Sequence, residues 1–324
     1  MKNLIFSGIQ PTGSLHLGNY LGAIKQWTKL QHEHESIFCI VDYHAITVAY
    51  DPKKLPGRIS DVALDLLACG IDPSKSTLFV QSQVPEHTEL GWIFNTLTPI
   101  AELERMTQYK DKSKQHKENI NAGLFTYPVL QAADVLLYKA NLIPVGEDQV
   151  QHVELMRVIA KKFNKTFGKL FPEPKPLLTE QARVMSLADP AKKMSKSLGE
   201  KHYIALADSD EVIKKKVRSA VTATSHGDTS PGVENLFAIL EALGGEALVK
   251  ELKAQHKKGS LQYSELKDVV ANTIISHLSP IRERRAELEK ERERVGEILI
   301  EGAKTAQKIA RDTMEEVRKK IGVR

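Results

Sequence analysis

The sequence is poor in cysteine: only 2 of its 324 residues are cysteines. Cys39 and Cys69 lie in apolar stretches and show no C-x-x-C spacing. Disulfide frameworks and most structural zinc or iron–sulfur sites need several clustered cysteines. The sequence therefore predicts no iron–sulfur cluster and no zinc, and we expect both thiols to be core side chains.

Long apolar runs are also missing. No run reaches the roughly 18 apolar residues that a membrane helix needs, and the apolar stretch near the N-terminus is too short for a signal peptide. These absences predict a cytoplasmic protein with no membrane partner. The net charge of +5 is compatible with a nucleic-acid partner but is too small to require one.

Strand and helix patterns alternate in the first part of the chain. Short apolar runs fill 4–9, 36–41, 77–80 and 142–145, with helical patterns between them. Parallel neighbouring strands need a crossover of helix length, so this alternation predicts an α/β fold with a doubly wound, Rossmann-type parallel sheet. A further strand is expected at 184–187.

Helical periodicity takes over from about residue 200. A chain of 324 residues is long enough for two domains, so we predict a Rossmann-type domain at 1–200 and an all-α domain at 201–324. Ser279-Pro280 is typical of a helix start and predicts that the last long helix begins there. The charged run 282–294 is interpreted as a solvated, salt-bridged helix face and not as a phosphate-binding surface.

Polar residues collect where the predicted strands end, at 10–16, 42–44 and 146–149. Ligands of such sheets bind at the carboxyl ends of the strands, which predicts that these segments line one crevice. His16 and Asn19 lie where a loop becomes a helix, and backbone amides at a helix start attract phosphate.

A second cationic segment strengthens the phosphate interpretation. The run 192–197 contains three lysines and two serines and precedes Gly199, a pattern typical of a mobile loop that covers a polyanion. Alone, His16 is an ordinary capping or surface histidine and the lysines are solvated surface. Together, the two segments favour a phosphate-bearing ligand.

Both segments resemble signatures of a known family. The sequence from His16 to Asn19 resembles the HIGH signature, and Lys193 to Ser197 matches the KMSKS signature of class I aminoacyl-tRNA synthetases. Asn19 replaces the second histidine, as is familiar in bacterial tryptophanyl enzymes, and Gln131 stands where those enzymes usually carry methionine, which alters the apolar lining of the amino-acid pocket. Segments across essentially the whole chain resemble the bacterial tryptophanyl-tRNA synthetases: 8–11, 42–47, 103–108, 132–134, 145–149 and 189–190.

The resemblance implies a ligase that uses ATP to convert L-tryptophan to tryptophanyl-adenylate and then transfers it to the 3′ end of tRNA(Trp). It also implies a homodimer, an anticodon-binding role for 201–324, and Mg²⁺ that is carried by ATP and not held by a metal site of the protein. The α-carboxylate, with a pKa near ~3.5, is already ionised at neutral pH, so positioning and charge stabilisation replace a general base. A tyrosyl-tRNA synthetase and a non-catalytic RNA-binding protein on the same fold are the alternatives.

The resemblance further implies which residues form the site. The catalytic side chains are expected to be His16, Asn19, Lys112, Lys193 and Lys196, with a solvated surface position as an equal alternative for Lys112. The ATP site is expected to comprise Gly8, Gln10, Pro11, Thr12, Gly18, Asn19, Gly146, Glu147, Asp148, Val184, Lys193, Met194, Ser195, Lys196 and Ser197. The tryptophan pocket is expected to comprise Phe6, His44, Tyr127, Asp134 and Gln149.

Asp134 is the expected determinant of amino-acid choice. It lies within the apolar stretch 130–138, and a buried carboxylate is costly without a hydrogen-bond donor. The indole N–H of tryptophan is such a donor. The alternative is an aspartate on the helix surface or one that is paired within the chain, and the motif match favours recognition.

Overall fold

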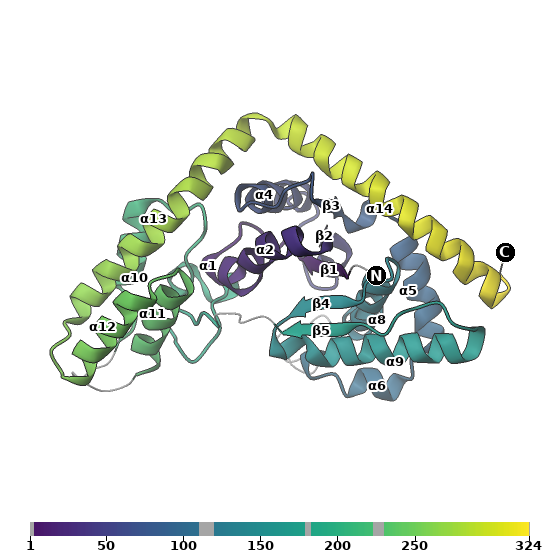
Figure 1. Ribbon diagram of the computed structural model, residues 1–324, viewed down its shortest axis with the longest axis horizontal. Coiled ribbons are helices and arrows are strands. Elements are labelled where there is room, and N and C mark those ends of the chain that lie inside the picture. Colours follow the sequence, from purple (N-terminus) through teal and green to yellow (C-terminus); the bar gives the residue numbers. More distant parts are fainter. Residues whose placement is uncertain (1–2, 110–119, 179–182, 223–229, 324) are drawn as a thin grey trace.

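The computed structural model describes residues 3–109, 120–178, 183–222 and 230–323, so Lys112 lies outside the described residues (Figure 1). The described residues form a 5-stranded sheet in the order β3-β2-β1-β4-β5, in which all neighbours are parallel. The strands are β1 (Leu4–Ile9), β2 (Glu35–Ile40), β3 (Ser76–Val80), β4 (Leu142–Val145) and β5 (Lys175–Leu178). The predicted doubly wound parallel sheet is confirmed, and its strand order changes direction between β1 and β4.

Helices bury both faces of this sheet. Side chains alternate along β2, so that Phe38 and Ile40 join one apolar core while Ile37 and Cys39 join the other. Strands that are covered on both faces read as continuous apolar runs, which is why the sequence pattern located them. One face is covered by α2 (Lys25–Glu33) and α4 (Leu55–Ala68); the other is covered by α5 (Glu86–Leu97), α8 (Ala122–Leu136) and α9 (Val150–Phe167).

The helix that follows β1 is interrupted near its start. It consists of α1 (Leu17–Asn19), the π-helix η1 (Tyr20–Ile24) and α2. Short pieces follow the next strands: α3 (Asp42–Ala45) after β2, η2 (Gln81–Gln83) after β3 and η3 (Glu147–Gln149) after β4, whereas α6 (Ile100–Glu104) comes later, after α5. π-turns inside helices are frequent at functional sites, and this one begins at Tyr20, where α1 ends.

The remaining helices follow the strands in the chain, and the last two of them arch over the sheet (Figure 1). These remaining helices are η4 (Lys196–Leu198), η5 (Glu200–His202), α10 (Asp210–Arg218), α11 (Pro231–Ala242), α12 (Glu246–Lys257), α13 (Tyr263–Lys290) and α14 (Arg292–Ile321). In Figure 1, α13 and α14 make an inverted V whose second arm descends past α5. Among the described residues, no helix combines the length and the apolar character that a membrane span requires.

Two sequence predictions in this region are wrong. Pro280 lies inside α13 and does not begin a helix, because the buried side chains of Ile274, Leu278 and Ile281 hold the helix together on both sides of it. Residues 184–187 form no strand: Met185 makes only an isolated antiparallel bridge with Lys193. The side chain of Asn235 occupies both the N–H and the carbonyl of Met185, at 2.8 and 2.9 Å, and so takes the groups that a strand partner would need.

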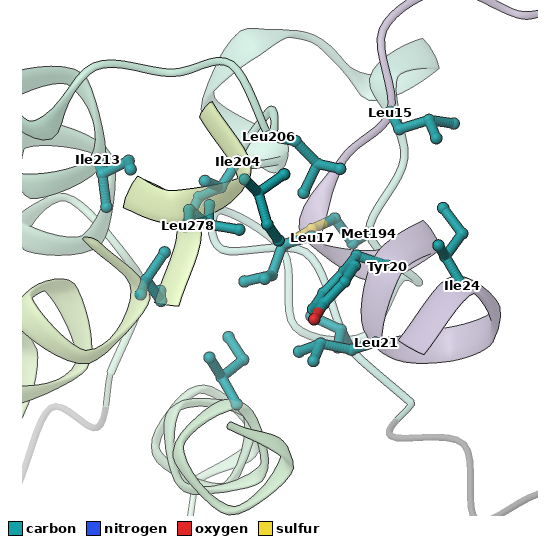
Figure 2. Close-up of a cluster of buried hydrophobic side chains, with 14 of the residues drawn as sticks. Leu15, Leu17, Tyr20, Leu21, Ile24, Met194, Ile204, Leu206, Ile213 and Leu278 are labelled. Atoms are coloured by element: carbon teal, nitrogen blue, oxygen red, sulfur yellow. The ribbon is translucent and has the colours of Figure 1, made fainter. Parts of the chain in front are cut away.

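A continuous apolar core joins the His16 helix to the helical part of the chain. Leu17, Met194, Ile204 and Leu278 gather in this core (Figure 2). The backbone strengthens the contact, because the Leu17 N–H donates to the Ile204 carbonyl at 2.8 Å. The segment that follows β1 is therefore held from both the sheet and the helices.

The last helix returns to the sheet. Along α14, Ala303, Ala306 and Ala310 belong to the same core as α5 and α8. A Cβ on Gly302 would lie 1.9 Å from the Leu78 carbonyl oxygen, so only glycine lets α14 approach β3 this closely. The domain boundary at residue 200 stays a prediction.

Candidate functional site

A cavity of about 450 Å³ opens at the carboxyl ends of β1 and β4. This is where the strand order changes direction, the position at which doubly wound sheets bind ligands. It brings together many residues that the sequence predicted for one site: Phe6, Gly8, Gln10, His16, Gly18, Asn19, His44, Tyr127, Asp134, Gly146, Asp148, Gln149, Lys193 and Met194. Their individual binding roles stay predictions.

Other predicted residues do not line this cavity. Val184 is buried in the adjoining core, where its carbonyl accepts a hydrogen bond from the Met194 N–H at 3.1 Å. Lys196 turns toward the loop that follows β1. The predicted residues outside the cavity lining are Pro11, Thr12, Glu147, Val184, Ser195, Lys196 and Ser197, and Lys112 lies outside the described residues.

The cavity also has lining residues that sequence reasoning did not assign to the site. Trp27, Gln108, Val135 and Ile143 line it although no motif position singled them out as ligand-binding. Gln131, noted only as a departure from the family pattern, lines it as well. Gln131 and Val135 lie on α8 near Asp134, one turn apart, so helical spacing from Asp134 was the signal that could have found them.

The geometry around His16 fixes its tautomer. His16 caps the helix: its Nδ1 accepts the Asn19 N–H at 3.3 Å. Burial, followed by the charges of Lys196 and Lys193, lowers the pKa of His16 from 6.5 to about 4. The ring is therefore neutral at pH 7, and because Nδ1 accepts, its proton sits on Nε2 as a donor.

Asn19 completes the same cap and keeps a donor. Its side-chain Oδ1 accepts the His16 N–H at 3.1 Å, so the amide nitrogen remains as its donor group. Gly18 belongs to the first signature and faces the second: a Cβ on Gly18 would lie 3.0 Å from the His16 ring and 3.3 Å from Cβ of Met194. The two predicted signatures thus meet at this glycine.

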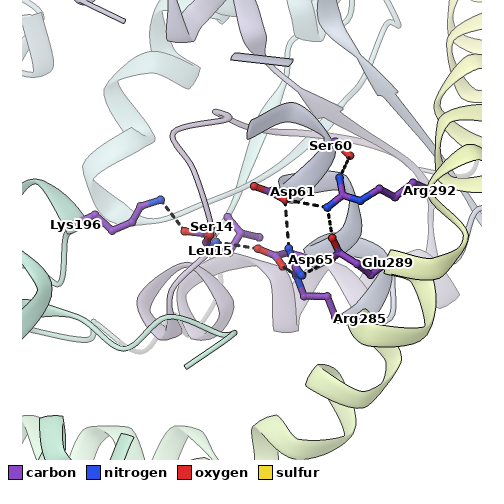
Figure 3. A network of polar contacts seen from close by, with 9 residues as sticks. All are labelled: Ser14, Leu15, Ser60, Asp61, Asp65, Lys196, Arg285, Glu289 and Arg292. Carbon is purple, nitrogen blue, oxygen red and sulfur yellow. Dashed lines mark hydrogen bonds and ion pairs between the residues drawn. The ribbon is translucent and has the colours of Figure 1, made fainter. Parts of the chain in front are cut away.

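The lysine-rich segment folds over the loop after β1. Lys196 Nζ donates to the Ser14 carbonyl at 2.6 Å (Figure 3), and it also donates to the Thr12 carbonyl at 3.2 Å. Burial lowers the pKa of Lys196 from its ordinary value. Lys193 lines the cavity directly, so the segment contributes one cation to the cavity wall and one to the loop beside it.

At the other end of the cavity, Asp134 is buried with three donors of the protein. Gln81 Nε2 and His87 Nδ1 both lie 2.7 Å from Oδ1, and His44 Nε2 lies 2.8 Å from Oδ2. Among the described residues, Oδ2 receives only this one hydrogen bond, so it retains a lone pair for a further donor.

The charge state of Asp134 follows from opposing effects. Burial raises its pKa, but the electrostatic attraction and hydrogen bonds of His44 and His87 outweigh burial and hold the pKa well below its ordinary value. Asp134 is therefore an ionised acceptor at neutral pH, and its three partners act as donors.

His87 is a polar residue that the sequence did not reveal. It is fully buried, and while its Nδ1 donates to Asp134, its Nε2 accepts the Tyr138 hydroxyl at 2.8 Å. Tyr138 in turn stacks on Phe6 with ring centroids 5.5 Å apart. His87 begins an otherwise ordinary amphipathic helix, so neither spacing nor composition marks it.

No group of three or more His, Cys, Asp or Glu side chains that could hold a metal ion occurs in the described parts of the chain.

Tyr127 borders the cavity beside His44, and burial raises the pKa of its hydroxyl to about 12. The site is therefore a cavity with neutral and cationic donors at one end and a buried anionic acceptor at the other.

Comparison with known proteins decides the family. The sequence model described as tRNA synthetases class I (W and Y) matches residues 2–279. The chain belongs to this family. The resemblance that the two signatures suggested is thereby confirmed.

Relatives of this synthetase cover its whole length. The tryptophan–tRNA ligase of Wolinella succinogenes is 46% identical over 332 residues, covering 100% of this chain and 99% of the relative. The crystal structure of tryptophanyl-tRNA synthetase from Campylobacter jejuni, complexed with ADP and tryptophan, is similar with a TM-score of 0.84 and 38% identity, covering 98% of this chain and 99% of that one. The enzyme from Mycoplasma pneumoniae matches with a TM-score of 0.88 and 35% identity over 99% and 98% of the two chains.

Proposed function

We propose that this synthetase activates L-tryptophan with ATP to tryptophanyl-adenylate and transfers it to the 3′ end of tRNA(Trp). The observation that carries the proposal is the free lone pair on the ionised, buried Asp134 at the apolar end of the cavity. An indole N–H is a donor without an acceptor, which suits such a carboxylate. The names of the relatives, and the ligands of the Campylobacter jejuni structure, support the same substrate.

The first step joins the amino acid to AMP. An oxygen of the tryptophan carboxylate attacks the α-phosphorus of ATP, an O–P bond forms, and the bond from that phosphorus to the bridging oxygen breaks and releases pyrophosphate. His16 Nε2–H and the Asn19 amide donate to phosphate oxygens, and Lys193 and Lys196 offset the charge of the departing pyrophosphate. Mg²⁺ enters with ATP and shares that charge.

In the second step a terminal ribose hydroxyl of tRNA attacks the activated carbonyl carbon, and AMP leaves. The helical residues 201–324 bind the anticodon arm. Support comes from the cationic last turn of α14, where Lys319 and Lys320 follow Arg318, whose guanidinium is paired with Glu89, because phosphate contacts carry much of the affinity for nucleic acid. The protein works in the cytoplasm, in keeping with its free cysteines.

The active form is a homodimer. Trp92 on α5 is 70% exposed and Ile100 on α6 is 66% exposed, which is unusual for large apolar side chains and suits an interface between two copies. Light scattering of the purified protein is expected to give twice the chain mass, and Trp92→Glu to shift it toward a single chain. A single-chain mass for the wild type contradicts the dimer.

The test of the function is amino-acid-dependent exchange of labelled pyrophosphate into ATP, run with each of the twenty amino acids. Exchange with tryptophan alone is the expected result. Exchange with tyrosine but not tryptophan contradicts the substrate assignment and supports the tyrosyl alternative. Binding of tRNA with no exchange for any amino acid contradicts the enzymatic assignment and supports an RNA-binding protein.

A further inference from the structure

Asp65 is a buried carboxylate that lies on α4, outside the lining of the cavity. Only 1% of its surface is exposed. Its Oδ2 accepts the backbone N–H of Leu15 at 2.9 Å, and its Oδ1 accepts Arg285 Nε at 2.7 Å (Figure 3). One carboxylate therefore connects the residue before His16 with the long helix α13.

Arg285 is held firmly by further partners. Its guanidinium also lies 2.7 Å from Glu289 and 3.4 Å from Asp61. Burial raises the pKa of Asp65, and the hydrogen bonds from Leu15 and Arg285 oppose this rise. Loss of Arg285 would leave a buried anion without its cation, which favours protonation and a weaker acceptor for Leu15.

The segment that Asp65 holds carries His16, which lines the cavity, and the carbonyl that anchors Lys196. Leu15 is flanked by Ser14, whose carbonyl accepts Lys196 Nζ at 2.6 Å, and by His16. The carbonyl of Leu15 accepts the Leu206 N–H at 2.9 Å, so this short segment is fixed on its other side as well. A displacement of Leu15 therefore moves the His16 ring and the Lys196 anchor together.

We propose that Asp65 and Arg285 are a positioning pair for adenylate formation: they fix the Leu15 backbone so that His16 and Lys196 meet the ATP phosphates. The pair makes the phosphate end of the cavity depend on α13, a helix of the part that binds tRNA in the proposed function. This inference rests on the proposed function. Arg285 belongs to the charged run 282–294, and the inference gives it a positioning role through the buried Asp65.

The test compares Arg285→Gln with a matched control on the same helix. Arg284, the preceding residue on α13, also reaches α4, where its Nη1 donates to the Ala68 carbonyl at 3.3 Å, and this contact does not involve the Leu15 segment. In pyrophosphate exchange, Arg285→Gln is expected to lower kcat by about 100-fold, because small displacements of reacting groups are this costly. The KM for tryptophan should change by less than about threefold, since Asp134 lies at the opposite end of the cavity.

Two further variants separate positioning from folding. Arg285→Lys keeps the charge and is expected to recover about tenfold of the lost kcat. Asp65→Asn keeps an acceptor for Leu15 but breaks the link to Arg285. Adding Arg285→Gln to Asp65→Asn should cost less than about twofold more, because residues that act through one contact are non-additive.

Several results would overturn the inference. They are equal losses of kcat in Arg284→Gln and Arg285→Gln, a loss confined to the KM for tryptophan, or fully additive effects of Asp65→Asn and Arg285→Gln. The ratios are measured with whichever amino acid the wild type activates. A wild type that activates tyrosine contradicts the tryptophan assignment and still leaves the positioning pair to be judged by its own ratios.

Discussion

Replacement of Asp134 by asparagine isolates the interaction that selects the amino acid. Asparagine has nearly the same shape, but it presents one oxygen and one NH₂ group where aspartate presents two acceptors. His44 and His87 donate to opposite oxygens, at 2.8 and 2.7 Å, so the asparagine NH₂ must face a donor whichever way it is oriented. If the asparagine oxygen keeps the hydrogen bonds from Gln81 and His87, the NH₂ group takes the place of Oδ2, which was the acceptor for the indole N–H.

The expected cost follows from the loss of one hydrogen bond to a charged acceptor. Such bonds contribute about 1.5–3 kcal/mol, which corresponds to a fall of about 10- to 150-fold in kcat/KM for tryptophan. The assay is tryptophan-dependent pyrophosphate exchange at neutral pH, where Asp134 is ionised. A thermal unfolding curve for the variant shows beforehand that it is folded.

A substrate analogue supplies the control. In an analogue with sulfur in place of the indole N–H, the donor is missing, so wild type should lose activity by a similar factor. The Asp134→Asn variant should then discriminate little between tryptophan and the analogue, within about threefold. Equal discrimination by wild type and variant would refute the role of Asp134 as the indole acceptor.

Three other changes test the packing and the phosphate end. Gly302→Ala should destabilise the protein by about 3 kcal/mol in denaturant unfolding, because its Cβ would lie 1.9 Å from the Leu78 carbonyl oxygen. Gly296→Ala on the same helix meets open space and should stabilise the protein by about 0.5–1 kcal/mol. Equal effects of the two substitutions contradict the contact between α14 and β3. Gly18→Ala should lower kcat of exchange by about tenfold, since its Cβ would lie 3.0 Å from the His16 ring, and unchanged kcat contradicts this. The folded pKa of His16 is lowered from 6.5 to about 4, so the unfolded state binds more protons between these pH values and the free energy of unfolding of the wild type falls as pH drops from 6.5 toward 4. His16→Asn should reduce this fall by at most about 3 kcal/mol. An unchanged fall in the variant contradicts the assignment.

The strands that carry the site could be predicted because burial on both faces leaves a continuous apolar run. The runs at 4–9 and 142–145 coincide with β1 and β4, and polar residues at their ends line the cavity. The lysine segment and the His16 helix were found through local motifs. Their meeting at Gly18 required the fold, because the Met194 contact joins segments far apart in the sequence.

The errors arose where distant partners decide the structure. Pro280 looked like a helix start because proline is favoured there, but packing carries α13 through it. Most of the run 282–294 is exposed and salt-bridged, as predicted, for example between Arg294 and Glu297. The half-burial of Arg285 could not be predicted, because it depends on Asp65, a residue of another helix. His87 was missed for the same reason: its partners are Asp134 on α8 and Tyr138 in the turn after α8, and sequence spacing does not connect them to it.

In the proposed function, the cavity binds tryptophan in contact with Asp134 and ATP in contact with His16. A crystal structure of the protein with tryptophan and an unreactive ATP analogue tests it most directly. We expect the indole nitrogen to lie about 2.9 Å from Oδ2 of Asp134 and a phosphate oxygen to lie at about the same distance from Nε2 of His16. An indole nitrogen directed away from Asp134, or phosphates bound outside the His16 end of the cavity, would contradict it.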